Sequence, residues 1–271
     1  MIRKLTELDR QKTLEYLSEE PAINLFIIGD IEGFGFDVEF QEMWADFDEQ
    51  DNIDGLLLRY HENFIPYSKK SDYDWSEFKS KIIETESNIE GHVAISGKES
   101  ILMQFGDILS HHKRRSTYFC ELTSREKLVK ENSNDIKDIK TAGPDDAGRV
   151  HGLIEEIVEF DSINDVDRIK HKLETNTGRI YYYEEKGLMT SVAQTTAENS
   201  MSAMIVGVAT LPEYRKAGLM SRCLSKLCDD VLSENKTLCL FYDNPKAGRV
   251  YHKLGFETLD MWTMINWDAN L

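Results

Sequence analysis

The stretch between residues 201 and 233 constrains this chain more than any other. A β-branched, apolar segment over residues 201–210 ends just before Pro212, and a helical period begins at Leu219. Apolar residues then recur three and four positions apart, which predicts a helix with one broad buried face. The second half of the chain is therefore expected to mix α and β structure. The apolar stripe consists of Leu219, Met220, Cys223, Leu224, Leu227, Cys228, Val231 and Leu232.

The loop between this strand and this helix has the composition of an anion site. It holds Arg215, Lys216 and Gly218. The first turn of a helix leaves several N–H groups free, and the macrodipole adds roughly half a positive charge there. The two cations add full charges, and a glycine lets a ligand approach the backbone closely. The sequence therefore predicts a site suited to a pyrophosphate, although the Walker pattern G-x-x-x-x-G-K-[ST] is absent.

A second strand and helix follow over residues 238–256. Asn244 is a good helix N-cap, Pro245 suits the first helical position, and Gly255 suits the C-terminal cap. Tyr251 lies within this helix, two turns after its start. The order strand, loop, helix, strand, helix thus occupies most of the last 70 or so residues.

These two blocks together resemble the GNAT superfamily of acyl-CoA-dependent N-acyltransferases. The family's phosphate loop follows Arg/Gln-x-x-Gly-x-Gly/Ala; this chain keeps the first and fourth positions and has Met220 where a small residue is usual. The later family pattern is N-x-x-A-x-x-x-Y-x-x-x-G-F. The chain keeps all five of its residues in register: Asn244, Ala247, Tyr251, Gly255 and Phe256. The resemblance is strong across residues 200–260, moderate across 135–200 and weak in the first half.

The resemblance implies an α+β fold, a GNAT-like twisted mixed β-sheet flanked by helices, with a second related N-terminal α+β domain. The polar stretch 124–134 lacks an apolar period, so the domain boundary is placed near residue 130. Residues 1–130 would form a degenerate GNAT-like or accessory domain and residues 135–271 the acyl-CoA-binding catalytic domain. Strand candidates over 40–47, 53–60 and 64–67 form a meander that echoes one in the second half, a weak internal repeat.

The remaining elements are expected from period and turn residues. Glu185, Lys186 and Gly187 suit a hairpin turn. The predicted strands cover residues 136–139, 179–183, 188–196, 201–210, 237–242 and 258–265, and the predicted helices cover residues 144–160, 219–232 and a segment that begins at Pro245.

By this resemblance, an acetyl or related acyl group passes from the co-substrate acetyl-CoA to the amine of a small or amino-acid-like acceptor. Tyr251 is the expected general acid for the departing thiolate, although a core tyrosine on the apolar face of the helix is the alternative. An N–H near Val208 would polarise the thioester carbonyl. The expected CoA-binding residues are Val208, Ala209, Thr210, Arg215, Lys216, Ala217, Gly218, Leu219, Met220, Ser221, Asn244 and Ala247.

The sequence does not identify a general base. Some GNAT members carry a glutamate on the strand before the phosphate loop, and Met204 occupies that place here. Any of Glu198 in the preceding turn, and Glu155, Glu156 and Glu159 on the first helix, could serve, but such an acid is more often a solvated surface residue. No metal is expected, because the histidines and cysteines lack ligand spacing.

Charge and composition exclude several classes of partner. The chain has 32 basic and 49 acidic side chains, a net charge of −17, which argues against nucleic acid. Residues 201–271 carry eight of each sign, so this end is the least repulsive place for an anionic ligand. No apolar run reaches 18 residues, and the first residues do not form a secretory signal, so a cytoplasmic protein with reduced thiols is expected.

Two functions remain open at the level of sequence. One is the acyl-CoA N-acyltransferase, in which the first domain would wall off the acceptor cleft or mediate a homodimer. The other is a non-catalytic CoA-binding or protein-interaction module. Met220 in the phosphate loop and the missing strand glutamate favour the second.

Overall fold

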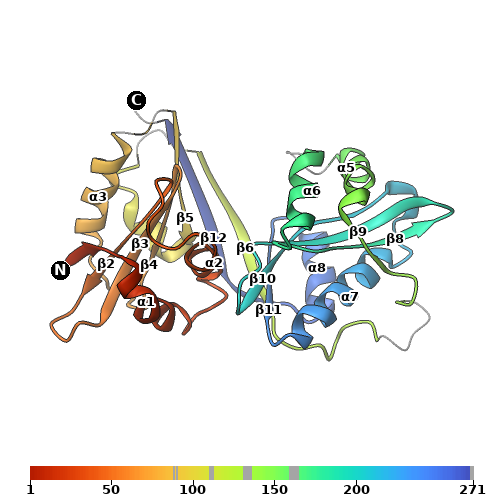
Figure 1. Ribbon diagram of the computed structural model, residues 1–271, viewed down its shortest axis with the longest axis horizontal. Coiled ribbons are helices and arrows are strands. Elements are labelled where there is room, and N and C mark those ends of the chain that lie inside the picture. Colours follow the sequence, from red (N-terminus) through yellow and green to blue (C-terminus); the bar gives the residue numbers. More distant parts are fainter. Residues whose placement is uncertain (88, 90, 110–112, 131–135, 159–164, 269–271) are drawn as a thin grey trace. The chain divides into compact units, whose positions relative to one another are not determined.

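A computed structural model describes residues 1–87, 89, 91–109, 113–130, 136–158 and 165–268 (Figure 1). The chain divides into two compact units, one formed by Met1–Phe119 with Leu259–Leu271 and the other by Cys120–Thr258. Each unit contains a sheet with helices packed on it, so the expected α+β fold is confirmed. None of the helices in the described ranges combines the length and the apolar character needed to cross a membrane.

The first unit is built around an antiparallel meander. Strands β2, β3 and β4 pair in the order expected from the alternation of apolar residues, and the strand order of the unit is β1-β2-β3-β4-β5-β12. The last strand of the chain thus returns to this unit, where it pairs antiparallel with β5. The elements are β1 (Ile2–Lys4), α1 (Arg10–Leu17), α2 (Leu25–Phe34), β2 (Gln41–Phe47), β3 (Ile53–Tyr60), β4 (Asn63–Tyr67), α3 (Ser76–Glu86), β5 (His92–Lys98), α4 (Glu99–Leu102), the start of β6 (Lys113–Leu122) and most of β12 (Glu257–Asp268).

The second unit has the strand order β6-β11-β10-β9-β8-β7, in which β8, β9 and β10 are antiparallel and β10 and β11 are parallel. Helices α5 and α6 lie on one face of this sheet and α7 and α8 on the other (Figure 1). The elements are β7 (Lys140–Thr141), α5 (Ala147–Glu155), α6 (Val166–Glu174), β8 (Ile180–Glu185), β9 (Leu188–Thr196), β10 (Ser202–Thr210), α7 (Leu219–Ser233), β11 (Thr237–Tyr242) and α8 (Pro245–Lys253).

Two expectations about local structure need correction, and one helix was not predicted. The strand predicted over 136–139 is wrong, because the Ile139 N–H donates to the Ile136 carbonyl at 3.0 Å and closes a turn. The helix predicted over 144–160 begins with a 3-10 turn and its α-helical part, α5, ends at Glu155; Phe160 lies outside the described residues. Helix α6 was not expected, because its apolar face is narrow and Ile169 is its one buried residue.

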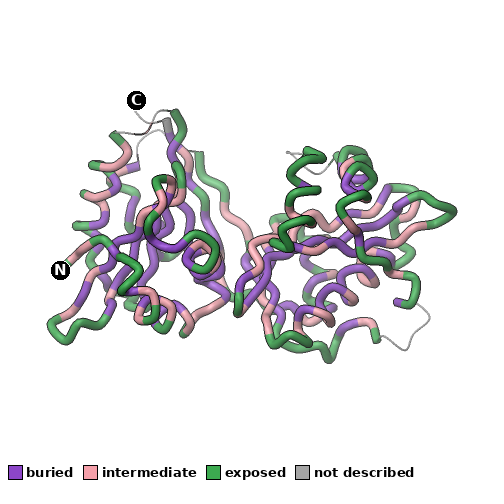
Figure 2. Tube along the Cα trace, in the orientation of Figure 1, coloured by how far each residue is buried: buried purple, intermediate pink, exposed green. Residues whose placement is uncertain are grey.

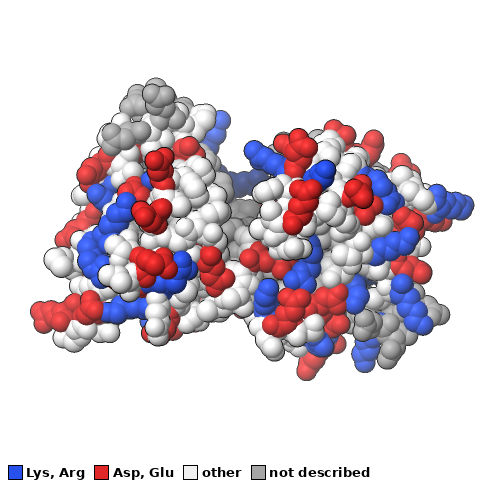
Figure 3. All heavy atoms as spheres, viewed as in Figure 1, with Lys and Arg blue, Asp and Glu red and all other residues white. Residues whose placement is uncertain are grey.

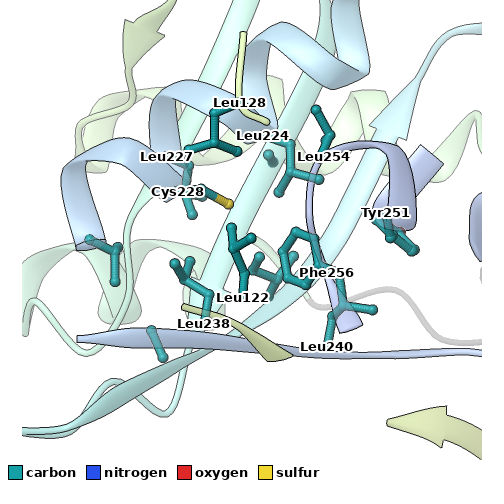
Figure 4. Packing of buried hydrophobic residues seen from close by; sticks show 14 of the residues in the cluster. Leu122, Leu128, Leu224, Leu227, Cys228, Leu238, Leu240, Tyr251, Leu254 and Phe256 are labelled. Atoms are coloured by element: carbon teal, nitrogen blue, oxygen red, sulfur yellow. The ribbon is translucent and has the colours of Figure 1, made fainter. Parts of the chain in front are cut away.

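The apolar stripe of α7 forms the core beneath the sheet of the second unit. Leu224, Leu227 and Cys228 are fully buried against β11 and against Leu254 and Phe256 (Figure 4). A fully buried leucine side chain contributes about 1.5–3 kcal/mol. The strands of this unit are mostly buried and their connecting turns are exposed (Figure 2). The packing holds the first turn of α7 beside the ends of β10 and β11, where the candidate site lies.

Candidate functional site

The two parallel strands of the second unit separate partway along their length. The register of β10 with β11 runs from Ser202 opposite Thr237 to Ile205 opposite Leu240. Residues 206–210 of β10 continue past this paired segment. A strand that leaves its neighbour exposes a row of backbone N–H and C=O groups, and an extended ligand can pair with them as an added strand would.

A β-bulge turns the backbone of β10 toward this gap. The register of β10 with β9 shifts between Val206 and Ala209, and Gly207 has a φ of 55°. The Gln194 side-chain amide donates to the Gly207 carbonyl at 3.4 Å, and the Ser191 hydroxyl donates to the Ala209 carbonyl at 3.0 Å. Both carbonyls therefore point toward β9.

The direction of the neighbouring N–H groups follows from peptide geometry. In a planar trans peptide the C=O and N–H point in opposite directions. Because the carbonyls of Gly207 and Ala209 face β9, the N–H groups of Val208 and Thr210 face away from it, toward the gap. The edge of β10 thus offers two donors at the spacing of an added strand, with the Val208 carbonyl between them.

The loop after β10 ends at an uncapped helix. Gly218, the N-cap residue of α7, has left-handed backbone angles (φ 78°, ψ 6°) and no side chain that could cap the helix. A Cβ built at Gly218 would meet no atom within 4 Å, so the space in front of the helix is open. The N–H groups of Leu219, Met220 and Ser221 have no intrahelical acceptor. Arg215 Nε donates to the Thr210 carbonyl at 3.1 Å, which holds this cation at the edge of the loop.

The second helix of the site begins as the sequence indicates. The Asn244 side chain accepts from the Lys246 N–H at 2.9 Å, and Pro245 occupies the first turn. Tyr251, two turns later, is 8% exposed and packs at the edge of the core, with ring centroids 5.9 Å from those of Tyr242 and Phe256 (Figure 4). Burial, and to a smaller extent Cys120, raises the pKa of Tyr251 to about 12, so its hydroxyl stays protonated at neutral pH.

These elements enclose a pocket of about 460 Å³. Twelve of the thirteen residues singled out from the sequence line it; Ala217 is exposed and lies outside the lining. Seven further residues line the same pocket, chiefly from the end of β11 and from the side of α8 next to Ala247: Ile157, Tyr214, Phe241, Tyr242, Asp243, Lys246 and Val250. Lys246 adds a cation near the loop. The helical spacing from Ala247 and Tyr251 could have indicated Val250, whereas no sequence signal marks the aromatic end of β11.

The carboxylates suggested as bases are held elsewhere or lie outside the lining. Glu198, with a side chain 7% exposed, bonds the Arg179 guanidinium at 2.7 Å and the Thr195 hydroxyl. Glu155 lies 3.5 Å from His151. Glu159 lies outside the described residues, and Met204 is buried in β10. Asp243 is the one carboxylate among the pocket residues that the structure describes.

The charge around the site is mixed. On the face shown in Figure 3, acidic and basic side chains are interspersed over the surface of each unit. Within the described ranges, no three His, Cys, Asp or Glu side chains gather closely enough to hold a metal ion. The cations of the pocket, Arg215, Lys216 and Lys246, are all exposed side chains of its rim.

The first unit contains a corresponding strand pair without a pocket. β4 pairs parallel with β5 at Asn63 opposite Ala94 and Phe64 opposite Ile95. Beyond this point the Tyr67 hydroxyl donates to Glu20 at 2.8 Å, and Lys98 donates to the same carboxylate at 2.7 Å. The space between these strands is too small to hold a water molecule. It is lined by Ile23, Asn24, Ile65, Pro66, Tyr67, Lys98, Ile101 and Trp262.

The helix that follows β4 has an acidic side chain bonded to its first residue. Asp74 accepts from the N–H and the hydroxyl of Ser76, at 3.0 and 2.5 Å, at the start of α3. The carboxylate therefore engages one of the N–H groups that an anion would use at the first turn of a helix. The two lysines of the preceding loop are also paired, Lys69 with Glu19 and Lys70 with Asp54, both at 2.6 Å.

Comparison with known proteins agrees with this geometry. Residues 153–256 match the model of the acetyltransferase (GNAT) family. A solved structure of a Drosophila protein is similar at a TM-score of 0.70 and 10% identity, covering 100% of this chain and 99% of that one. A tandem GNAT protein from the clavulanic acid biosynthesis pathway has a TM-score of 0.58 and 13% identity, covering 100% and 99%. A GNAT-family acetyltransferase from Colwellia psychrerythraea has a TM-score of 0.57 and 13% identity, covering 100% of both chains.

No curated protein sequence matches the chain. The family match and the solved structures nevertheless agree on one class. The second unit carries a GNAT-family domain, and the chain as a whole has the fold of a tandem GNAT protein. The resemblance inferred from the two sequence blocks is thereby confirmed.

Proposed function

We propose that this chain is an acyl-CoA-dependent N-acyltransferase that moves an acetyl or related acyl group to the amine of a small or amino-acid-like acceptor. One observation carries the proposal: the pocket beside β10 joins inward-facing backbone donors to the uncapped first turn of α7. A strand-like arm that ends in a pyrophosphate matches both parts.

The residues present fit coenzyme A. The N–H groups of Val208 and Thr210 would pair with the amides of the pantetheine arm. The N–H groups of Leu219, Met220 and Ser221 would hold the pyrophosphate, with Arg215 and Lys216 supplying charge. The Met220 side chain lines the pocket but is partly buried against the core of the unit, and a Cβ built at Gly218 meets no atom within 4 Å, so the space at the N-cap of α7 stays open.

Bound acyl-CoA supplies a thioester, whose carbonyl carbon forms a bond with the amine nitrogen as its bond to sulfur breaks. The Val208 N–H would donate to the carbonyl oxygen as negative charge develops on it, an interaction whose loss typically costs about 10²–10³ in rate. Tyr251 would then give its proton to the departing sulfur.

The pKa of Tyr251 sets the cost of that proton transfer. With a thiol at its usual pKa of about 8.5 and Tyr251 at about 12, the transfer is uphill by about 4.8 kcal/mol at 1.36 kcal/mol per unit. Burial raises thiol pKa values as well, and that of Cys223 in the same unit rises to about 12. A thiolate that leaves into the same buried environment is therefore a stronger base than in water, and the mismatch shrinks.

The acceptor amine must lose a proton before it attacks. An alkylamine with a pKa near 10.4 is about 3.4 units above pH 7, a cost of about 4.6 kcal/mol. Glu198 is held by Arg179, so a proton acceptor other than this carboxylate would serve the step, such as water or a group supplied with the acceptor. The acidic surface of the chain favours cationic acceptors by steering them.

The test combines two measurements on the full chain. Thiol release from acetyl-CoA is followed with a panel of amines, and thermal unfolding is followed with CoA. Free CoA at 100 times its Kd raises the free energy of unfolding by about 2.7 kcal/mol. Thiol release that depends on an amine supports the transferase.

The non-catalytic CoA-binding module is the second candidate, favoured by Met204 where some members of the family have a glutamate. A thermal shift with CoA and no thiol release across the panel would favour the module. No thermal shift at all would contradict both functions.

A further inference from the structure

A partly buried lysine on α6 contacts the bulge of β10 through one intervening side chain. Lys172 Nζ donates to Gln194 Oε1 at 2.8 Å, and Gln194 Nε2 donates to the Gly207 carbonyl at 3.4 Å. Gln194 is 2% exposed, and a Cβ built at Gly207 would lie 2.5 Å from Gln194 Nε2. Lysine, amide and bulge are therefore packed in direct contact.

Lys172 determines which way the Gln194 amide is turned. A lysine amine held in this geometry donates, so the amide oxygen must face it. The amide NH₂ must then face the Gly207 carbonyl, which can only accept. If the amide turned over, oxygen would face oxygen at Gly207, and NH₂ would face the ammonium of Lys172. Both contacts would be repulsive.

The surrounding structure makes room for the lysine. A Cβ at Gly178 would lie 2.9 Å from Lys172 Cδ, so the glycine opens the space that the lysine stem occupies. The charge that faces Lys172 from a neighbouring element is Glu198, which is itself held by Arg179. Desolvation lowers the pKa of Lys172 to about 8, which reflects how far the amine is removed from water.

The contact between Lys172 and Gln194 affects the reacting atoms through the peptide bond between Gly207 and Val208. Because the Gly207 carbonyl is held toward β9, the Val208 N–H of the same peptide is held toward the pocket. We propose that Lys172 and Gln194 are positioning residues for acyl transfer, which together fix the peptide between Gly207 and Val208 so that its N–H meets the developing oxyanion. This inference rests on the proposed function.

The test uses two variants and one matched control in the full chain. Lys172→Met removes the amine and keeps the stem. Gln194→Glu keeps an acceptor for Lys172 but places an oxygen against the Gly207 carbonyl. Lys170→Met, on the same helix with a side chain 51% exposed, is the control. We expect kcat to fall by about 10- to 100-fold in both variants, because an oxyanion donor is misaligned rather than deleted. KM for acyl-CoA should stay within about threefold, and Lys172→Arg should restore part of kcat.

A role in packing alone predicts a different pattern. Gln194→Glu is nearly isosteric, so an unchanged kcat in that variant would overturn the proposal. A parallel loss of CoA affinity and of melting temperature in both variants would overturn it as well, since a folding defect would then explain the kinetics.

A readout independent of activity separates this inference from the proposed function. In ¹H–¹⁵N spectra without ligand, the Val208 amide resonance should move in Lys172→Met and in Gln194→Glu, and it should not move in Lys170→Met. A Val208 resonance that is the same in all four proteins would overturn the positioning role, even if the wild type is an active transferase. A resonance that moves as expected in a protein that releases no thiol would contradict only the proposed function.

Discussion

In the part of the chain that the structure describes, each unit contains a pair of parallel strands that begin together and then part, β10 with β11 and β4 with β5, and the two pairs end differently. In the second unit, β10 and β11 open onto a pocket of about 460 Å³. In the first unit, Tyr67 and Lys98 meet at Glu20 and leave no space between β4 and β5. The topology is shared, so topology alone does not make a site.

The helices that connect the two strands of each pair, α7 and α3, differ in the same sense. α7 begins at Gly218, which leaves its first N–H groups open, whereas α3 begins with its N–H and a hydroxyl bonded to Asp74. The first turn of α7 can accept an external anion, whereas the first residue of α3 already bonds the Asp74 carboxylate. The comparison indicates that a GNAT-like unit keeps or loses its ligand through a few side chains at one strand end and one helix start.

The largest expected effect comes from removing the Tyr67 side chain, which fills the space between β4 and β5 in the first unit. Tyr67→Ala removes a fully buried ring and should lower the free energy of unfolding by about 3–5 kcal/mol, as aromatic-to-alanine changes in cores do. It should not create a second CoA site, because the Asp74 carboxylate still bonds the first N–H of α3. Urea unfolding and a CoA titration measure the two quantities, with Tyr118→Ala, 42% exposed, as the control. A second bound CoA in Tyr67→Ala would break the comparison.

The open unit should depend on the hydroxyl of Tyr251. Tyr251→Phe should lower kcat by about 100-fold, the low end for loss of a general acid, and leave CoA affinity within about twofold. Steady-state thiol release and a binding titration give both numbers. Tyr214→Phe, which changes another tyrosine of the pocket lining, should leave kcat nearly unchanged. Equal turnover in Tyr251→Phe and the wild type would remove the acid role and leave a core tyrosine.

A smaller effect is expected from the loop cation. Arg215→Gln should raise the Kd for CoA by about tenfold, because it removes a charge-assisted hydrogen bond worth about 1.5 kcal/mol. The Kd should also become less sensitive to salt. Calorimetric titrations at two salt concentrations provide the measurement, and Arg168→Gln, with a side chain 79% exposed, is the matched control. If Arg215→Gln left the Kd for CoA unchanged at low salt, the pyrophosphate would bind away from Arg215.

The smallest expected effect is a fall in the stability of the second unit at alkaline pH, which arises from its buried thiols. All four cysteines, including Cys120, belong to the second unit, and burial raises the pKa of Cys223 to about 12. In the unfolded chain the thiol loses its proton near pH 8.5, so the unfolded state binds fewer protons above that pH and stability falls as pH rises toward 12. At pH 9.5 the loss from this thiol is about 1.4 kcal/mol.

Unfolding measured from pH 7 to 9.5 checks this slope. Cys223→Ala should make the slope shallower by about this amount, whereas Leu227→Ala, which creates a cavity on the same helix, should lower stability equally at every pH. Burial also raises the pKa of Cys228 and of Cys239, so part of the slope remains in Cys223→Ala. A slope in Cys223→Ala identical to that of the wild type would show that Cys223 does not contribute to the alkaline limit.

Much of the second unit could be predicted because its signals are local. Asn244 caps α8 with its own side chain, and β9 and β11 have the bounds that alternation indicated. The pocket lining followed from the order of strand, loop and helix, because that order brings Thr210, Gly218 and Ala247 together.

What escaped prediction depends on contacts between distant segments. Ala217 points to solvent because the loop turns at Lys216, which has a φ of 70°. Tyr242 lines the pocket because of how β11 ends beside α8, and the pairing of β12 with β5 leaves no trace in either strand's pattern. The contact between Lys172 and Gln194 joins a helix to a strand and has no spacing rule.

Amide hydrogen exchange of the full chain, with and without CoA, tests the central claim most directly. CoA should slow exchange at Val208 and Thr210 and at residues 219–221, and it should leave residues 63–76 unchanged. Slower exchange in residues 63–76, or no change at Val208 and the first turn of α7 under saturating CoA, would contradict the assignment of the ligand to the open strand pair.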